Sequence, residues 1–139
     1  MKIESFSGPY RWLSNFYMVD VEFDGKIYPS TEHAFQAAKT FDEKDREDVR
    51  QADTPKLAKK LGKLVKLRED WDSVRLSVME DMLRKKFENP ELRRKLLETG
   101  HAELIEGNYW HDTFWGVCDG KGENNLGKLL MKIRDEIRG

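Results

Sequence analysis

A β-hairpin that leads directly into a helix is the feature that most constrains the fold of this chain. Residues 19–24 alternate between apolar and acidic side chains, which is the pattern of a strand with one buried face. Asp24-Gly25 is a strong turn signal, and Lys26–Tyr28 returns as the second strand. Ser30 follows at once and can cap a helix that begins at Thr31. A short, rigid element just before this helix fixes the direction in which Glu32 points.

The helix predicted over residues 31–40 presents two different faces. Three alanines, at positions 34, 37 and 38, share one side and allow another element to approach closely. Glu32, Gln36 and Lys39 share the opposite side, and Phe35 flanks them. One interpretation is a solvated surface helix whose Glu32–Lys39 pair contributes little. The other is a functional row of a carboxylate, an amide and an amine.

The rest of the chain predicts further helices around this small β element. Asp42–Ala52 is highly charged and reads as a short solvated helix or loop. Thr54-Pro55 starts a helix that Gly62 can end, and Asn89-Pro90 starts one that ends at Thr99-Gly100. A long helix is expected over about Ser73–Glu88, and Asn125 can cap the last one. We predict a predominantly α-helical α+β fold in which residues 1–139 form one domain.

The expected cores of these helices are apolar residues at helical spacing. For the helix that begins at Pro55 they are Leu57, Ala58 and Leu61, and for the long helix Leu76, Met79, Leu83 and Phe87. The last helix carries a continuous stripe from Leu126 to Ile137. Gly127, in its first turn, costs about 1 kcal/mol against alanine and therefore indicates close approach by a backbone or a ligand.

Composition limits the classes of function. An aromatic content of 11% is too high for a disordered chain, and a net charge of -1 predicts no bulk attraction to nucleic acid or to an anionic membrane. The sequence contains no transmembrane run and no signal-peptide pattern at its start. A single cysteine, Cys118, excludes an intramolecular disulfide and a multi-cysteine zinc site, and the three histidines show no ligand spacing. We expect a cytoplasmic, metal-free protein that needs no cofactor.

Two segments are unusually rich in aromatic residues. Residues 10–17 contain four, and we expect Trp12 and Phe16 to fill one end of the core. The alternative is a loop that stacks a flat ligand while Asn15 contacts its polar edge. Residues 107–116 contain four more aromatics and either fill space or form the wall of a binding site. Asp112, among them, either caps a turn or is a partly desolvated carboxylate suited to proton transfer.

Two features indicate where an anion could bind. Lys and Arg residues cluster between Lys56 and Arg68, which is either a solvated face or a phosphate site. The glycine-rich loop at residues 119–125 opens onto the last helix, and the start of a helix can hold an anion.

Seven stretches, in this order, resemble the NADAR family, also called YbiA-like, and together they span nearly the whole chain. They are Leu13–Tyr17, Tyr28–Lys39, Leu67–Trp71, Lys86-Phe87, Thr99-Gly100, Asp112–Gly116 and Asn125–Met131. The resemblance implies cleavage of an N-glycosidic bond between a ribose carbon and a base nitrogen. It also implies two substrate classes: phosphorylated ribosylamino-pyrimidine intermediates of riboflavin synthesis, and ADP-ribose attached to guanine in nucleic acid. Nucleic acid is then expected only as a substrate. The alternative is a non-catalytic module that binds ADP-ribose or an NAD derivative in the same pocket.

The resemblance assigns candidate roles to residues of this sequence. Glu32 is the general base or charge stabiliser with Asp112 as its partner, and Lys39 either hydrogen-bonds the sugar or attacks its carbon as an amine. We expect the helix of Glu32 and the loop of Asp112 to meet across the pocket. The candidate substrate-binding residues are Asn15, Phe16, Gln36, Arg68, Trp71, Trp110, Trp115, Gly116 and Asn125.

Overall fold

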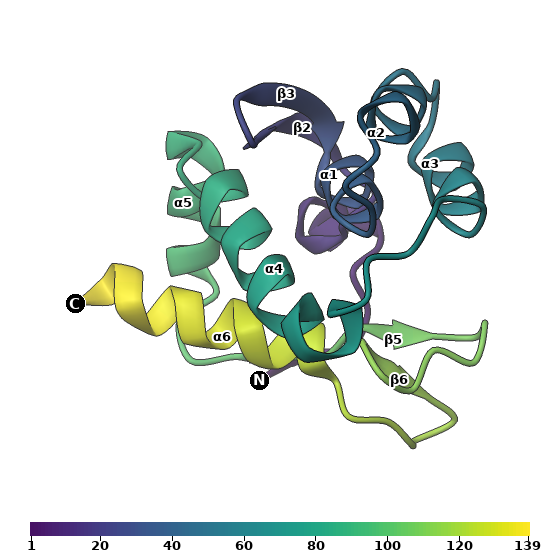
Figure 1. Cartoon of the computed structure of the whole chain (residues 1–139). Helices are drawn as coiled ribbons and strands as arrows, with labels where there is room; N and C mark the ends of the chain where they lie inside the picture. The colour runs from purple at the N-terminus through teal and green to yellow at the C-terminus, as the bar shows by residue number, and fades with distance from the viewer. The chain divides into compact units, whose positions relative to one another are not determined.

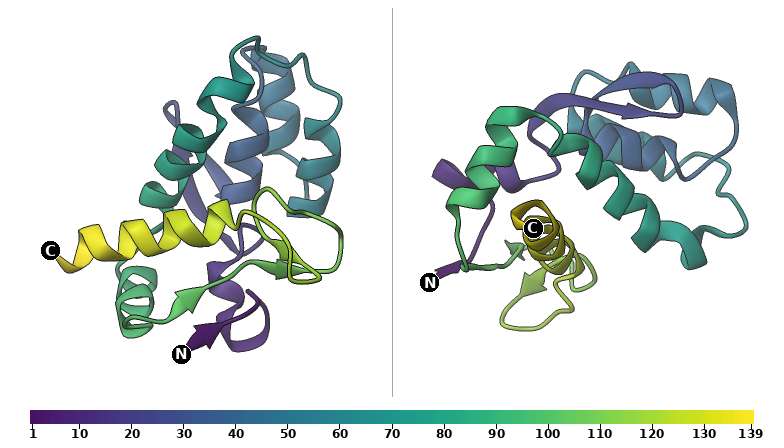
Figure 2. Two further views of the ribbon diagram at one scale, coloured as in Figure 1. Left: turned by 90° about the horizontal axis from the view of Figure 1, so that it is seen from below. Right: turned by 90° about the vertical axis from the view of Figure 1, so that its left-hand side faces the viewer.

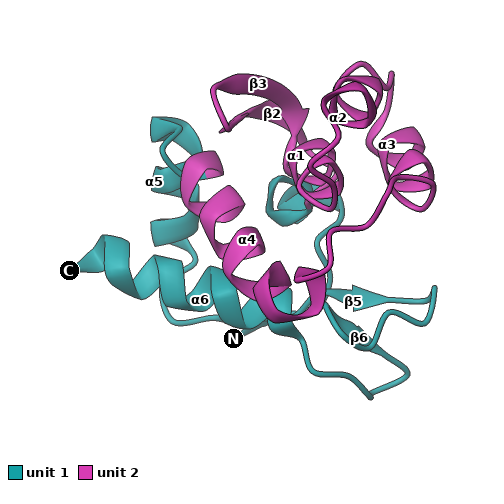
Figure 3. Ribbon diagram, viewed as in Figure 1, with its two compact units in different colours: residues 1–14, 87–139 teal, residues 15–86 magenta.

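The computed structural model describes residues 1–139 and confirms a predominantly helical α+β fold. The chain divides into two compact units (Figure 3). Unit 1 contains Met1–Ser14 and Phe87–Gly139, and unit 2 contains Asn15–Lys86. That residues 1–139 act as one domain stays a prediction. None of the helices is both long enough and apolar enough to cross a membrane.

Unit 2 is built around the helix that follows the hairpin. Its elements are β2 (Met18–Phe23), β3 (Lys26–Ser30), α1 (Thr31–Ala37), α2 (Glu43–Arg50), α3 (Pro55–Gly62) and α4 (Trp71–Lys86). The two strands pair antiparallel with Phe23 opposite Lys26, and Asp24 and Gly25 both take the positive φ of a tight hairpin turn. α1 contacts both strands and all three other helices of the unit (Figure 1). It is therefore the centre of unit 2.

The predicted start of α1 is confirmed. The Ser30 hydroxyl accepts a hydrogen bond from the His33 amide at 3.1 Å and caps the helix. Every residue of α1 is buried, including Glu32 and Gln36. The interpretation of α1 as a solvated surface helix is wrong, because the hairpin and three helices surround it.

Unit 1 combines short strands with two helices. Its elements are β1 (Lys2–Ile3), the 3-10 helix η1 (Gly8–Leu13), α5 (Pro90–Glu98), β4 (Glu103–Leu104), β5 (Gly107–Asn108), β6 (Val117–Cys118) and α6 (Asn125–Arg138). β1 pairs in parallel with β4, and β5 with β6. α6 packs on α5 and on β4 (Figure 2). A Cβ atom at Gly127 would lie 2.1 Å from the Leu104 carbonyl oxygen, so this glycine permits the close approach of α6 to a backbone.

The start of α6 differs from the prediction by one residue. Asn124, with a positive φ of 55°, occupies the cap position, and Asn125 is the first helical residue. The amides of Asn125 and Leu126 donate to the carbonyl oxygens of Phe114 and Trp115. These two donors are therefore used within the protein, and an anion at this helix start cannot receive them.

Three apolar residues expected in the core are exposed instead: Leu57 at 38%, Leu76 at 44% and Phe16 at 41%. In α3 the buried residues are Ala58 and Gly62, small residues that suit the close contact of this helix with α1. In α4 the closely spaced buried residues are Met79, Met82, Leu83 and Lys86, so Leu76 lies about one turn before them. Trp12 is buried, as predicted.

His33 ties the start of α1 to the segment after α2. Its ring is fully buried, with Nδ1 2.6 Å from the Ser30 hydroxyl and Nε2 2.9 Å from the Ala52 carbonyl oxygen. A carbonyl can only accept, so Nε2 carries the proton and Nδ1 accepts from Ser30. Burial lowers the pKa of His33 below its usual value, and the neutral ring satisfies both partners.

We expect His33 to make folding stability depend on pH. In the unfolded chain the histidine protonates near pH 6.5, whereas the folded chain resists protonation until the pH is lower. The contribution of His33 is therefore fully present above about pH 6.5 and is lost as the pH falls below it. Urea unfolding at pH 7.5 and pH 5.5 measures this loss, which His33→Gln should reduce. The exposed His101 is the control, and an equal loss in His33→Gln and His101→Gln would contradict the assignment.

Candidate active site

The polar row on α1 is organised around Glu32. The Glu32 side chain is only 7% exposed, and Gln36, one turn later, donates from Nε2 to its Oε2 at 2.5 Å. The Glu32 amide donates to the Asn15 carbonyl oxygen at 3.1 Å. The loop thus fixes the backbone of Glu32, and Gln36 orients its carboxylate, so the group is held in place as a positioned acid or base would be.

Two buried amide oxygens lack hydrogen-bond partners: Oδ1 of Asn15, at the start of unit 2, and Oε1 of Gln36, in α1. The hydroxyl of Thr31, the first residue of α1, is a third buried polar atom without a partner. Such atoms are uncommon in folded proteins and call for an explanation at each position. Carbonyl oxygens of amides suit hydroxyl donors, and a ribose ring carries such donors. Contact of Asn15 and Gln36 with a substrate stays a prediction, and Gln36 Oε1 faces Gly62 of α3.

Lys39 lies just after α1 and is half-buried. Burial lowers the pKa of its ammonium group, the Glu32 carboxylate opposes this, and the positive charges of Lys59 and Lys63 lower the pKa further. A lowered pKa increases the neutral fraction of the amine, and only the neutral amine can act as a nucleophile. Which of its two predicted roles Lys39 has stays a prediction.

We expect Lys63→Ala to raise the pKa of Lys39. The substitution removes a like charge that disfavours the ammonium form. The pH dependence of Lys39 labelling by an amine-selective reagent, followed by mass spectrometry, measures the change. Lys44→Ala on α2 is the control, since Lys44 pairs with Asp48 at 3.0 Å. An unchanged or lowered Lys39 pKa in Lys63→Ala would show that the α3 charges do not act on this amine.

Arg68 joins the site through the backbone of Lys39. Its amide donates to the Lys39 carbonyl oxygen at 2.7 Å, and its guanidinium group pairs with Asp70 at 2.6 Å. The guanidinium also lies 4.2 Å from the centre of the Phe41 ring. A hollow of ≈ 540 Å³ is present here, lined by Thr40, Phe41, Asp42, Lys66, Leu67, Arg68, Glu69 and Asp70. Arg68 thus lines this hollow, and its contact with a substrate stays a prediction.

Trp71, the other candidate from this segment, is buried and packs on Phe35 with 5.1 Å between ring centres. Its contact with a substrate base stays a prediction.

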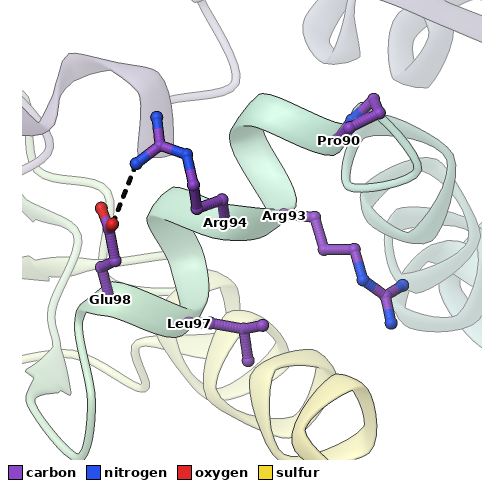
Figure 4. Close-up of a pocket in the computed structure, with 5 residues that line it drawn as sticks. All are labelled: Pro90, Arg93, Arg94, Leu97 and Glu98. Atoms are coloured by element: carbon purple, nitrogen blue, oxygen red, sulfur yellow. Dashed lines mark hydrogen bonds and ion pairs between the residues drawn. The ribbon is translucent and has the colours of Figure 1, made fainter.

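A second hollow lies along α5, in unit 1, and contains none of the predicted site residues. It measures ≈ 400 Å³ and is lined by Pro90, Arg93, Arg94, Leu97 and Glu98 (Figure 4). Arg94 and Glu98 form an ion pair at 2.9 Å one turn apart on the helix. One helix supplies the whole lining, so we do not assign it a role.

In unit 1, Asp112 caps a turn, as one of its two interpretations predicted. Its Oδ1 accepts from the amides of Phe114 at 3.1 Å and Trp115 at 2.9 Å. The Asn108 side chain makes two hydrogen bonds to the Asp112 backbone: Nδ2 donates to the carbonyl oxygen, and Oδ1 accepts from the amide. The catalytic role of Asp112 and its pairing with Glu32 stay predictions, because Glu32 belongs to unit 2.

The remaining candidates of unit 1 surround the same turn. Trp110 is half exposed against Tyr109, and Trp115 packs edge-on against Phe114. A Cβ atom at Gly116 would lie 2.1 Å from the Glu106 carbonyl oxygen, so packing accounts for this glycine. Asn125 donates from Nδ2 to the Phe114 carbonyl oxygen at 2.9 Å instead of capping α6. Contact of these four residues with a substrate stays a prediction. The same holds for Phe16, which belongs to unit 2.

Lys86, at the end of α4, is a charged residue that the structure buries completely. Burial lowers the pKa of Lys86 to about 7, and its ammonium nitrogen lies 5.9 Å from the centre of the Tyr17 ring. Its helical spacing from Met79 and Leu83 places it on the buried face of α4. That spacing was the signal that could have identified it.

The fold and site define a mostly helical α+β protein with a buried, hydrogen-bonded carboxylate beside a lysine of lowered pKa. The chain belongs to the NADAR family: the model described as "NADAR domain" matches residues 4–138.

Named relatives agree with this assignment. The chain is 43% identical over 137 residues to "N-glycosidase YbiA" of Escherichia coli (strain K12), covering 96% of this chain and 85% of that protein. It is 38% identical over 131 residues to "Riboflavin biosynthesis protein VVA0006" of Vibrio vulnificus, covering 91% of this chain but 35% of that protein. The NMR structure of E. coli YbiA superposes with a TM-score of 0.87 at 42% identity, covering 99% of this chain and 84% of that one. The predicted enzyme class, an N-glycoside hydrolase, agrees with the names of these relatives.

Proposed function

We propose that this chain is an N-glycosidase that hydrolyses the bond between a ribose carbon and a base nitrogen, with Glu32 as the essential carboxylate. The observation that carries the proposal is the buried Glu32 side chain, oriented by Gln36 at 2.5 Å on the central helix of unit 2. The names of the relatives, N-glycosidase among them, support the same chemistry.

Cleavage of an N-glycoside develops positive charge on the ribose and negative charge on the departing base. A carboxylate beside the sugar stabilises the first charge and can take a proton from the attacking water. Water then supplies the hydroxyl group at the sugar carbon, and its proton reaches the nitrogen of the leaving base. The short hydrogen bond from Gln36 keeps the Glu32 carboxylate in one orientation for this step.

Lys39 has two chemically distinct roles within this proposal. As an ammonium group it donates a hydrogen bond to a sugar hydroxyl. As a neutral amine it attacks the sugar carbon, the carbon–nitrogen bond to the base breaks, and ring opening gives an iminium that water hydrolyses. The lowered pKa of Lys39 supports the second role.

For the substrate we propose phosphorylated ribosylamino-pyrimidines. The Vibrio vulnificus relative is named a riboflavin biosynthesis protein, which supports this class. ADP-ribose on guanine is the competing substrate class, and a non-catalytic binding module is the competing kind of protein.

The experiment offers the purified chain a phosphorylated ribosylamino-pyrimidine and, separately, guanine-ADP-ribosylated DNA. Mass spectrometry follows the products of both reactions. We expect free ribose phosphate from the first substrate at a kcat/KM at least tenfold above that for the second. If only the second substrate reacts, giving restored guanine and free ADP-ribose, the function would instead be the reversal of nucleic-acid modification. Binding without product from either would favour the binding module.

A further inference from the structure

We propose that Gly62 of α3 is a positioning residue for Glu32 and acts through the side chain of Gln36. The inference rests on the role of Glu32 proposed above. It assigns a function in the site to a residue that lies on a different helix from the carboxylate.

The contact between Gly62 and Gln36 leaves no room for a side chain. A Cβ atom at position 62 would lie 1.9 Å from Oε1, 2.7 Å from Cδ and 3.0 Å from Cβ of Gln36. Real Cβ atoms essentially never come this close to a neighbour, so the Gln36 carboxamide would have to move. Gln36 is 3% exposed and has little free space in which to do so.

Backbone conformation does not explain the glycine. Gly62 is the last residue of α3, it does not take a positive φ, and Lys63 after it is also in the right-handed helical region. α3 ends at Gly62, as the sequence predicted, but without the left-handed backbone that would require glycine there. Alanine is preferred over glycine in a helix by about 1 kcal/mol. The close packing against Gln36 is therefore the reason that glycine suits this position.

The same carboxamide connects Gly62 to the catalytic residue. Its Nε2 donates to Glu32 Oε2, while its Oε1 faces Gly62 and has no hydrogen-bond partner. A rotation that exchanged the two atoms would bring Oε1 against the Glu32 carboxylate, acceptor against acceptor. Gly62 and Glu32 therefore constrain opposite sides of one amide group. A methyl group at position 62 displaces the amide and removes the orientation that it gives to Glu32.

A double-mutant cycle on the full chain tests the inference, with the phosphorylated ribosylamino-pyrimidine as substrate. Gly62→Ala is expected to lower kcat at least tenfold while KM changes less than threefold. In a Gln36→Ala background, which lacks Oε1 and Cδ and retains only the Cβ at 3.0 Å, adding Gly62→Ala should change kcat less than twofold. The exposed Leu57 of α3 supplies the control, and Leu57→Ala should leave kcat within twofold of wild type.

Equal losses from Gly62→Ala in both backgrounds would show that Gly62 acts through helix packing and would overturn the inference. Full kcat in Gln36→Ala alone would also overturn it, even where Gly62→Ala does not fold. Failure of the proposed function looks different, because wild type would then form no product or Glu32→Gln would retain full activity. A readout independent of turnover is the ¹³C resonance of the Glu32 carboxylate. It should shift in Gly62→Ala and not in Leu57→Ala.

Discussion

Glu32→Gln is expected to lower kcat by about 10²- to 10⁴-fold, the range found when a positioned general acid or base is lost. Glutamine has nearly the same shape, and its carbonyl oxygen can still accept the hydrogen bond from Gln36. It carries no negative charge, so it neither stabilises the cationic sugar nor accepts a proton from water. We expect the substrate Kd to change only a few-fold. Steady-state kinetics and isothermal titration on the same preparations separate the two effects.

The matched control is Glu43→Gln on α2, which removes an exposed carboxylate of the same type. Its kcat should equal that of the wild type. Glu32→Gln with wild-type turnover would exclude Glu32 as the base, whatever the substrate is.

Lys39→Ala has the second largest expected effect, a loss of about 10²-fold or more in kcat. Alanine removes the side-chain nitrogen that both proposed roles need. Because the amine is half-buried, a water molecule is a poor substitute for it. Lys39→Arg separates the roles, because arginine retains the charge and the donors but cannot form an iminium. Recovery of activity in Lys39→Arg supports hydrogen bonding to the sugar.

Borohydride reduction during turnover gives the complementary evidence for Lys39. An iminium between Lys39 and the sugar carbon would be reduced to a stable amine, and peptide mapping would find the added sugar phosphate on that lysine. Lys66, a neighbouring lysine of the same unit, should remain unmodified. Full activity in Lys39→Ala would remove Lys39 from the mechanism altogether.

The turns and helix caps that hold the site in place were predicted correctly from the sequence. The Asp24-Gly25 turn, the Ser30 cap and the caps at Thr54 and Asn89 all form as expected. Each depends on a few neighbouring residues, and one sequence contains all the information that they need. The prediction that α1 carries Glu32 and Gln36 on one face followed from the same rules.

Burial was harder to predict, because it depends on elements far away in the chain. Glu32 and Gln36 are polar, yet α2, α3, α4 and the hairpin enclose the helix that carries them. Lys86 is buried for the same reason, while Leu57 and Leu76 remain exposed. The role of Gly62 was hidden because its partner, Gln36, lies 26 positions earlier in the sequence.

The most direct test of this account is the stoichiometry of products from a phosphorylated ribosylamino-pyrimidine. Wild type and Glu32→Gln would be compared by mass spectrometry under identical conditions. We expect one free ribose phosphate for each free base with wild type, over many turnovers, and almost none with Glu32→Gln despite retained binding. Equal product from both proteins would contradict the central role of Glu32, and binding without any product from wild type would contradict an N-glycosidase of this substrate.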